Sequence, residues 1–132
     1  MILDSSALIA ILRKEPEWSE YLTAVEDSAH CSMSAANFFE SAIVVDGKRD
    51  AVASREFDAY LRDAKVRIVA VDEAQARIAR EAYRDFGKGS GHPARLNFGD
   101  CFAYALAKAT GEPLLYKGDD FSHTDAGNAL PR

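Results

Sequence analysis

Three acidic residues stand alone in stretches that carry no other charge. Each is the only charged side chain in a run of at least twelve residues: Asp4 in 1–12, Glu40 in 31–45 and Asp100 in 96–107. A carboxylate inside an apolar element is costly unless a partner offsets the loss of its hydration. No lysine or arginine is adjacent to any of the three in the sequence. If the carboxylates converge in the fold, a hard divalent cation such as Mg²⁺ or Mn²⁺ is their natural counter-charge.

A fourth source of carboxylate follows the apolar run at residues 114–116. Asp119 and Asp120 stand side by side there, just after Lys117-Gly118. If residues 114–116 form a strand, these acids also lie at the carboxyl end of a strand. Either of them could equally be an ordinary turn residue, because aspartate is common in turns.

The three isolated acids also have local interpretations. Asp4 could cap a helix that begins near Ser5. Asp100 lies three residues after Asn97, so it could simply complement the dipole of a helix that starts there. Glu40 could make a local hydrogen bond within its helix. The coincidence of all three is much less expected than any one alone, which favours a shared site.

Short apolar runs alternate with longer amphipathic segments, which predicts strands separated by helices. The expected strands cover residues 1–4, 30–33, 67–71 and 114–116, with an edge strand near Leu130. The expected helices cover residues 8–12, a segment opening at Pro16, 34–45, 50–64, 73–86 (capped by Asp72 and Gln75) and 97–110. This order favours an α/β fold with a central parallel sheet of four to five short strands flanked by helices. In such folds, ligands bind beyond the carboxyl ends of the strands.

Composition narrows the class of protein. The chain has 132 residues, which favours a single domain over 1–132, and 48% hydrophobic with 28% charged residues is typical of globular proteins. The net charge of −5 excludes a generic basic coat for nucleic acid, so nucleic-acid binding would need a local site. No run approaches the roughly 18 apolar residues of a membrane span, and no basic segment precedes Asp4. We therefore expect a cytoplasmic protein with no membrane segment.

Two further groups of residues are predicted to be structural. Cys31 and Cys101 fit no metal-binding or CxxC spacing, so we expect two buried, reduced thiols. Four aromatic residues at helical spacing are predicted to lie in the core: Phe38, Phe39, Phe98 and Phe102.

The order of the acidic motifs resembles that of the PIN-domain ribonucleases, specifically the VapC-type toxins of bacterial toxin–antitoxin pairs. The resemblance covers essentially the whole chain and rests on four segments: Ile2-Leu3-Asp4-Ser5-Ser6, Phe38-Phe39-Glu40-Ser41-Ala42, Asn97-Phe98-Gly99-Asp100-Cys101 and Lys117-Gly118-Asp119-Asp120-Phe121. It implies a PIN fold, an endoribonuclease that depends on Mg²⁺ or Mn²⁺, a homodimer, and inhibition by a cognate antitoxin protein. By position, it implies catalytic and metal-binding roles for Asp4, Glu40, Asp100 and Asp120, with Asp119 as the alternative for the fourth acid.

The chemistry fits these residue types. Hydrolysis of a phosphodiester needs an activated water and neutralisation of developing charge, and one or two Mg²⁺ ions held by carboxylates supply both. We expect in-line attack without a covalent enzyme intermediate, with Asp4 and Asp100 as the main metal ligands. RNA that approaches an acidic pocket also needs cations and polar groups to hold its phosphates. The residues predicted to contact RNA are Ser5, Arg13, Lys88, Arg95 and Lys117.

Two other functions remain open at this point. A receiver-like signalling domain is also α/β, also gathers acids around Mg²⁺ and uses a lysine after a late strand, for which Lys117 is a candidate. That pattern requires two adjacent acids after the first strand, whereas Asp4 is followed by serines. The other alternative is an inactive PIN-fold module that only binds a partner, and the retention of all the acids argues against it.

Overall fold

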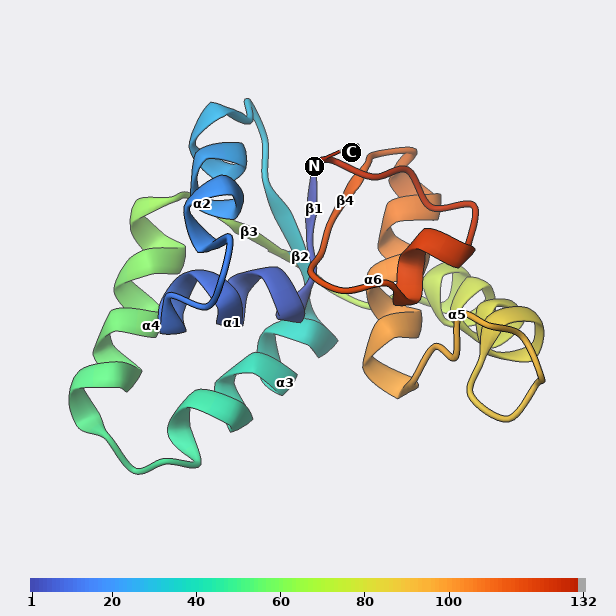
Figure 1. Cartoon of the computed structure of the whole chain (residues 1–132), viewed down its shortest axis with the longest axis horizontal. Helices are drawn as coiled ribbons and strands as arrows, with labels where there is room; N and C mark the ends of the chain where they lie inside the picture. The colour runs from blue at the N-terminus through green and yellow to red at the C-terminus, as the bar shows by residue number, and fades with distance from the viewer. Residues whose placement is uncertain (131–132) are drawn as a thin grey trace.

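The computed structural model describes residues 1–130, and within them four strands form one parallel sheet in the order β3-β2-β1-β4 (Figure 1). The strands are short: β1 (Ile2–Leu3), β2 (Ser32–Ser34), β3 (Arg67–Val69) and β4 (Leu114–Leu115). β1 pairs with β2 on one side and with β4 on the other, and every pairing is parallel. The predicted α/β fold with a central parallel sheet flanked by helices is confirmed.

Helices cover both faces of this sheet (Figure 1). On one side lie α1 (Ser5–Arg13), α2 (Trp18–Asp27), α3 (Ala35–Asp46) and α4 (Ala51–Asp63). On the other side lie α5 (Glu73–Phe86) and α6 (Phe98–Thr110). A short 3₁₀ turn, η1 (Asp120–His123), follows β4.

Strands β1 and β4 are apolar and fully buried because both faces of the sheet are covered there. In β1, Ile2 packs in the core on the α5 and α6 side, and Leu3 packs in the core on the α1, α2 and α4 side. Leu114 and Leu115 of β4 divide between the two cores in the same way. Successive strand residues point to opposite faces, so a strand buried on both faces reads as a continuous apolar run.

The carboxyl edge of the sheet is where two strands turn directly into helices. Asp4 follows β1 and caps α1 by accepting from the backbone N–H of Ser6. Ser34 ends β2 and caps α3 by accepting from the backbone N–H of Ala36. Aspartate and serine are favoured at this position because the side-chain oxygen satisfies an N–H group that has no partner within the helix.

Several predicted boundaries are wrong by a few residues. The first helix begins at Ser5, and α2 begins at Trp18 rather than at Pro16, because Glu17 has a φ of 70° and interrupts the helix. No edge strand forms near Leu130 within the described residues. A single parallel bridge joins Leu114 and Asn128 instead.

The predicted capping box at the start of α5 is only half formed. Asp72 accepts from the backbone N–H of Gln75 at 2.8 Å, as predicted. The side-chain amide of Gln75 does not return to Asp72 but donates to the carbonyl of Ala70 at 3.2 Å. The reciprocal bond of the motif, from the backbone N–H of Asp72 to Gln75 Oε1, is absent among the described residues, and that oxygen is buried without a hydrogen-bond partner.

The aromatic core prediction is wrong for two of four residues. Phe39 in α3 is 64% exposed and Phe98 in α6 is 78% exposed, while Phe38 and Phe102 are half-buried. Helical spacing identified an apolar face on each helix, but it does not show whether another element covers that face. Phe39 and Phe98 are consequently surface features that need their own explanation.

The two cysteines are buried and unpaired, as predicted. Burial raises the pKa of both the Cys31 and the Cys101 thiol to about 11, so both are protonated at neutral pH. Among residues 1–130, no helix has the length and apolar character that a membrane crossing needs.

Candidate active site

Asp4 is a buried acid at the carboxyl edge of the sheet, and only 3% of the residue is exposed. The backbone N–H of Ser6 donates to Asp4 Oδ2 at 3.0 Å, and the hydroxyl of Ser6 donates to the same oxygen. Ser6 Oγ also accepts a 2.9 Å hydrogen bond from the backbone N–H of Lys117, just after β4. Asp4 thus caps α1, the local role that its sequence context allowed, and it also points a carboxylate into the edge where β1 and β4 end.

Glu40 reaches the same edge from α3. Ser5 Oγ donates to Glu40 Oε1 at 2.6 Å, and Asn37 Nδ2 donates to the same oxygen at 3.4 Å. Because Ser5 follows Asp4 in the chain, these bonds bring Glu40 beside Asp4, and the charge of Glu40 contributes to a raised pKa of Asp4. Glu40 is half-buried rather than buried, because the outward face of α3 is open to solvent.

Two residues that the sequence analysis did not select hold α3 against α6. Asn37 is fully buried, and its Nδ2 donates to the carbonyl of Gly99 at 2.9 Å. A Cβ added at Gly99 would lie 2.0 Å from Glu40 Oε2, so only glycine leaves room for that carboxylate. Asn37 precedes Glu40 by three residues, the spacing that places two side chains on one helix face. That spacing is the signal that could have found it.

Asp100 is the third residue of α6 and forms a reciprocal capping box with Asn97. The backbone N–H of Asn97 donates to Asp100 Oδ2 at 3.0 Å, and the backbone N–H of Asp100 donates to Asn97 Oδ1 at 2.9 Å. The local role considered for Asp100 is therefore real. The carboxylate also lies among other acids: burial raises its pKa to about 7, and the charges of Asp4, Asp120 and Glu40 add to the rise.

The two acids after β4 have different neighbours. Asp120, the first residue of η1, contributes to the raised pKa of Asp100. Asp119 instead acts on Tyr116, whose pKa is raised first by burial and then by the charge of Asp119. Both side chains are exposed. This difference favours Asp120 as the fourth member of the acidic group.

The four acids have no protein counter-charge. Within the described residues, no ion pair joins a lysine, arginine, histidine or the N-terminus to any of them. Burial, with a smaller contribution from the charge of Glu40, raises the pKa of Asp4 to about 6 despite the two hydrogen bonds from Ser6. Hard carboxylate oxygens that repel one another and lack a protein cation are a donor set that suits Mg²⁺ or Mn²⁺.

The side chains are not arranged as a closed metal cage. Over residues 1–130, no three acidic, histidine or cysteine side chains are placed to hold one ion together. Asp4 and Asp100 each turn one oxygen toward a backbone cap, at Ser6 and Asn97 respectively. A shared metal site therefore stays a prediction.

Of the basic residues predicted to contact RNA, Lys117 lies beside Glu40, with which it lines a pocket that also includes Ser5 and Ser6. The other three lie on exposed surface. Lys117 Nζ forms a 2.9 Å ion pair with Glu15 Oε1, and its side chain is one-third exposed. Arg13 is exposed at the end of α1, and Lys88 and Arg95 are exposed in the loop between α5 and α6. No ion pair within the described part of the chain joins any of them to the four acids, so their contact with RNA stays a prediction.

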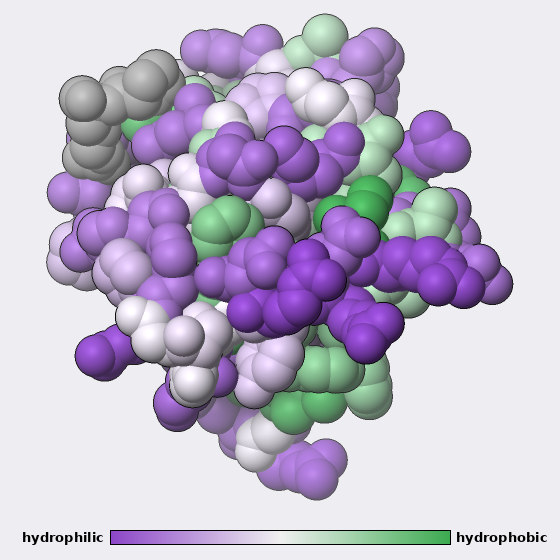
Figure 2. All heavy atoms as spheres, turned by 90° about the vertical axis from the view of Figure 1, so that its right-hand side faces the viewer, coloured by the Kyte–Doolittle hydropathy of each residue, from purple (hydrophilic) through white to green (hydrophobic). Residues whose placement is uncertain are grey.

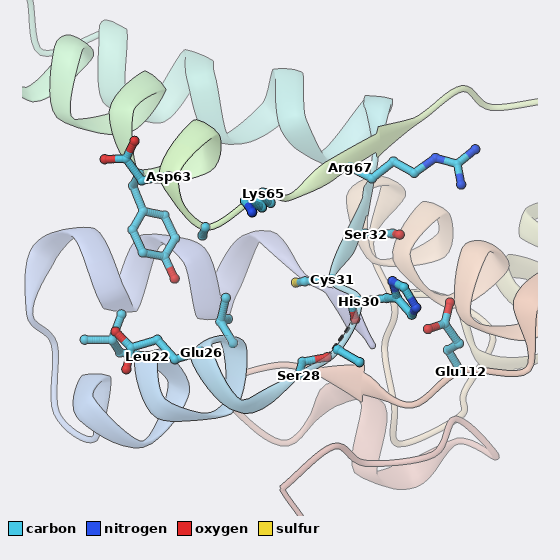
Figure 3. A pocket seen from close by; sticks show the side chains of 14 residues that line it. Leu22, Glu26, Ser28, His30, Cys31, Ser32, Asp63, Lys65, Arg67 and Glu112 are labelled. Atoms are coloured by element: carbon cyan, nitrogen blue, oxygen red, sulfur yellow. Dashed lines mark hydrogen bonds between the residues drawn. The ribbon is translucent and has the colours of Figure 1, made fainter.

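A wide cavity of about 1060 Å³ lies at the opposite, amino-terminal edge of the sheet (Figure 3). Side chains of both charge signs line it: Glu26, Asp63, Glu112, Lys65 and Arg67. Cys31 also lines it, but its protonated thiol is a poor nucleophile. This cavity presents no catalytic set, so the acids at the carboxyl edge are the candidate site.

A parallel sheet whose carboxyl edge gathers acids from β1, α3 and α6 defines a PIN-type domain, and the family model described as PIN domain matches residues 1–127. The chain is 52% identical to ribonuclease VapC28 of Mycobacterium tuberculosis over 132 residues, which is 100% of this chain and 99% of that protein. It is 49% identical to ribonuclease VapC42 of the same species over 125 residues, 95% of each chain. The chain belongs to the PIN-domain family and, within it, to the VapC ribonucleases, which confirms the resemblance found in the sequence.

Solved structures show the same fold at low sequence identity. VapC20 of Mycobacterium tuberculosis, described as a toxin that cleaves the sarcin–ricin loop, aligns with a TM-score of 0.76 and 16% identity over 98% of both chains. VapBC2 of Rickettsia felis, solved with a DNA fragment from its promoter, aligns with a TM-score of 0.75 and 13% identity. The alignment covers 96% of this chain and 94% of that one.

Proposed function

We propose that the chain is the toxin of a toxin–antitoxin pair and hydrolyses RNA phosphodiester bonds with Mg²⁺, for which Mn²⁺ can substitute. Relatives that match its full length are named VapC ribonucleases, and PIN-domain ribonucleases generally depend on a divalent metal ion. The observation that carries the proposal is that the fold brings three acids from distant segments together. Ser5, which follows Asp4, hydrogen-bonds Glu40, and the Glu40 carboxylate lies against Gly99, which precedes Asp100. Such a group of acids, without a protein cation, is destabilising in itself and has a clear use only with a bound cation.

Each residue of the site has a distinct part in the proposed reaction. Asp4 and Asp100 are the main metal ligands, and Glu40 and Asp120 complete the set. When bound, the ion neutralises charge on the phosphate and makes water more acidic. Ser5 orients the carboxylate of Glu40 through its 2.6 Å hydrogen bond.

Cleavage of labelled total RNA tests this function. The wild-type chain should cleave with Mg²⁺ or Mn²⁺ and stop in EDTA, and Asp4→Asn should reduce cleavage at least 100-fold. Asp58→Asn is the matched control, because Asp58 is an exposed acid on α4, outside the site. Cleavage that survives EDTA or survives Asp4→Asn, or an absence of any cleavage, would refute the proposal.

Two protein partners follow from the same proposal, a cognate antitoxin and a second copy of the chain. Support for the second copy comes from large apolar side chains left exposed on α3 and α4: Phe39, Ile43, Val44 and Val52. Light scattering should find a dimer that Ile43→Ser weakens, and a monomeric wild type would exclude it.

Growth arrest on expression should be relieved by co-expression of the adjacent antitoxin. RNA and antitoxin are both partners in the cytoplasm, which is where we propose that the protein acts.

The receiver-like alternative loses its main candidate residue. A receiver uses its late lysine to contact a phosphorylated aspartate, but Lys117 pairs with Glu15 instead. Labelling of the chain by acetyl phosphate, without RNA cleavage, would restore that alternative. Retention of RNA binding without any cleavage would favour the inactive binding module.

A further inference from the structure

We propose that the groove between α5 and α6 binds one unstacked nucleobase of the RNA strand, adjacent to the point of cleavage. This proposal rests on the proposed ribonuclease function and names a subsite for its substrate. The groove has a volume of about 490 Å³ and its lining is mainly apolar. We call it the base groove and define it by five of its lining residues: Arg80, Tyr83, Lys88, Phe98 and Phe102.

Phe98 is the most exposed aromatic side chain of the base groove. At 78% exposure it is more exposed than any other large apolar side chain in the described residues. It is held from one side by Phe102, with ring centroids 4.9 Å apart and ring planes at 80°. Tyr83, 51% exposed, extends the aromatic surface across to α5. Single-stranded nucleic acid binds to such aromatic platforms because every base can stack on an exposed ring.

The charges around the base groove favour a nucleotide over an apolar protein segment. Arg77 and Arg84 of α5 are already paired with neighbouring acids. Arg80 and Lys88, which line the groove, have no acidic partner within 4 Å among residues 1–130. Seen from the α5 side, strongly hydrophilic side chains cross the middle of the surface and apolar side chains lie above and below them (Figure 2). An apolar ring flanked by two unpaired cations matches a base flanked by its phosphates.

The position of the base groove relative to the acids indicates which nucleotide of the RNA would occupy it. Phe98 and Asp100 both lie in the first turn of α6, two residues apart, so they point roughly 200° apart around the helix. A helix with its side chains is about 10–12 Å wide. A base stacked on Phe98 therefore belongs to a nucleotide beside the reacting phosphate and not to the phosphate itself. Loss of the Phe98 ring should therefore weaken RNA binding and leave the chemical step nearly unchanged.

Binding of single-stranded RNA tests this subsite. The probes are fluorescein-labelled 12-nucleotide oligomers of adenylate, uridylate and cytidylate, titrated into the full chain that carries Asp4→Asn, so that the RNA stays intact. Adding Phe98→Ala should weaken binding about 5- to 100-fold, the value of stacking one base. Phe98→Tyr keeps a stacking ring and should bind like the parent. Ile68→Ala removes an exposed apolar side chain of β3 outside the base groove and should also bind like the parent.

A second readout separates stacking from charge. Phe98→Ala should leave the dependence of binding on salt unchanged, whereas Lys88→Ala should reduce the slope of log Kd against log salt by about 1. In the cleaving wild-type background, Phe98→Ala should raise KM and leave kcat within about threefold. Unchanged affinity in Phe98→Ala, or a change of oligomeric state in that variant by light scattering, would overturn the proposal, the latter by assigning the groove to a second copy.

A different result would refute the proposed ribonuclease function. If the wild-type chain cleaves no RNA, that function falls, whatever Phe98 does. If the wild type cleaves RNA and Phe98→Ala binds and cleaves like the parent, only the base groove falls.

Discussion

The side-chain amide of Asn37 in α3 donates a 2.9 Å hydrogen bond to the carbonyl of Gly99 in α6. This bond joins the two helices that carry Glu40 and Asp100, and both of its ends lie next to an acid of the site. Asn37 Oδ1 is buried and has no hydrogen-bond partner within the described residues. A buried polar atom without a partner is destabilising by roughly 1–3 kcal/mol. Against that penalty, the amide of Asn37 donates two hydrogen bonds, to Glu40 and to Gly99, which hold α3 against α6.

We predict that Asn37→Asp disrupts the site more than Asn37→Ala. Aspartate keeps the size of the side chain but places a carboxylate against the Gly99 carbonyl and Glu40, where two donated hydrogen bonds stood. The free energy of unfolding should fall by roughly 3 kcal/mol for Asn37→Asp, the effect of an unpaired buried charge. Asn37→Ala should lose roughly 1–2 kcal/mol. Urea unfolding in EDTA measures both, and equal stability of the two variants would contradict this role.

Gly99→Ala should separate activity from stability. The added Cβ would meet Glu40 Oε2 at 2.0 Å, and because this is the end of a flexible side chain, Glu40 can move away while the helix stays in place. Alanine is also the better helix former, by up to about 1 kcal/mol. We expect cleavage to fall at least 10-fold, with the melting temperature unchanged or higher. A variant that loses stability and activity in parallel would show that Gly99 serves the fold alone.

The stability of the metal-free chain should depend on pH through Asp4. Its pKa is about 6 in the folded chain and 3.8 as the reference value, so the folded state holds this proton more tightly. Folding is therefore favoured below about pH 4, and this contribution is lost as the pH rises through about 6, by about 3 kcal/mol in total. Asp100, with a folded pKa of about 7, acts in the same direction.

The variant Asp4→Asn isolates this contribution, since asparagine caps a helix about as well as aspartate. In EDTA, the variant should be more stable than wild type at pH 8, and the difference should shrink toward pH 4. Urea unfolding at several pH values gives the curve. A difference that does not change with pH, or that grows toward low pH, would mean that Asp4 is not forced to ionise in a buried place.

Asp119 and Asp120 form a natural matched pair of variants. Asp120→Asn should lower cleavage at least 10-fold, since of these two residues only Asp120 contributes to the raised pKa of Asp100. Asp119→Asn should leave cleavage within about twofold and lower the pKa of Tyr116, on which Asp119 acts. Cleavage rates and a spectrophotometric titration of tyrosine measure these effects. The opposite order of the two cleavage rates would assign the fourth position to Asp119.

The candidate acids could be selected from the sequence because their isolation is a local property. Asp4, Glu40 and Asp100 are conspicuous as single charges in uncharged runs, and apolar strand sequences place the first and last strands in a parallel sheet. Asn37 and Gly99 have no local sequence feature that distinguishes them. Their importance depends on α3 meeting α6, a contact between residues far apart in the chain.

The incorrect predictions also depend on contacts that the local sequence does not show. Phe39 and Phe98 are apolar and helically spaced, but burial depends on whether a neighbouring element covers the helix face. The side chain of Gln75 is oriented by its amide bond to the carbonyl of Ala70, and its oxygen does not accept from Asp72. The local roles first set against a shared site for Asp4 and Asp100 are also real, since each caps a helix while lying among the acids.

Calorimetric titration of Mn²⁺ into the metal-free chain tests the central claim most directly, because it reports the ion without needing the RNA target. The account predicts saturable binding to the wild type and to Asp58→Asn, with affinity at least 10-fold weaker in both Asp4→Asn and Asp100→Asn. Failure of the wild type to bind, or equal affinity in all four proteins, would contradict the claim that these separate acids form one metal site.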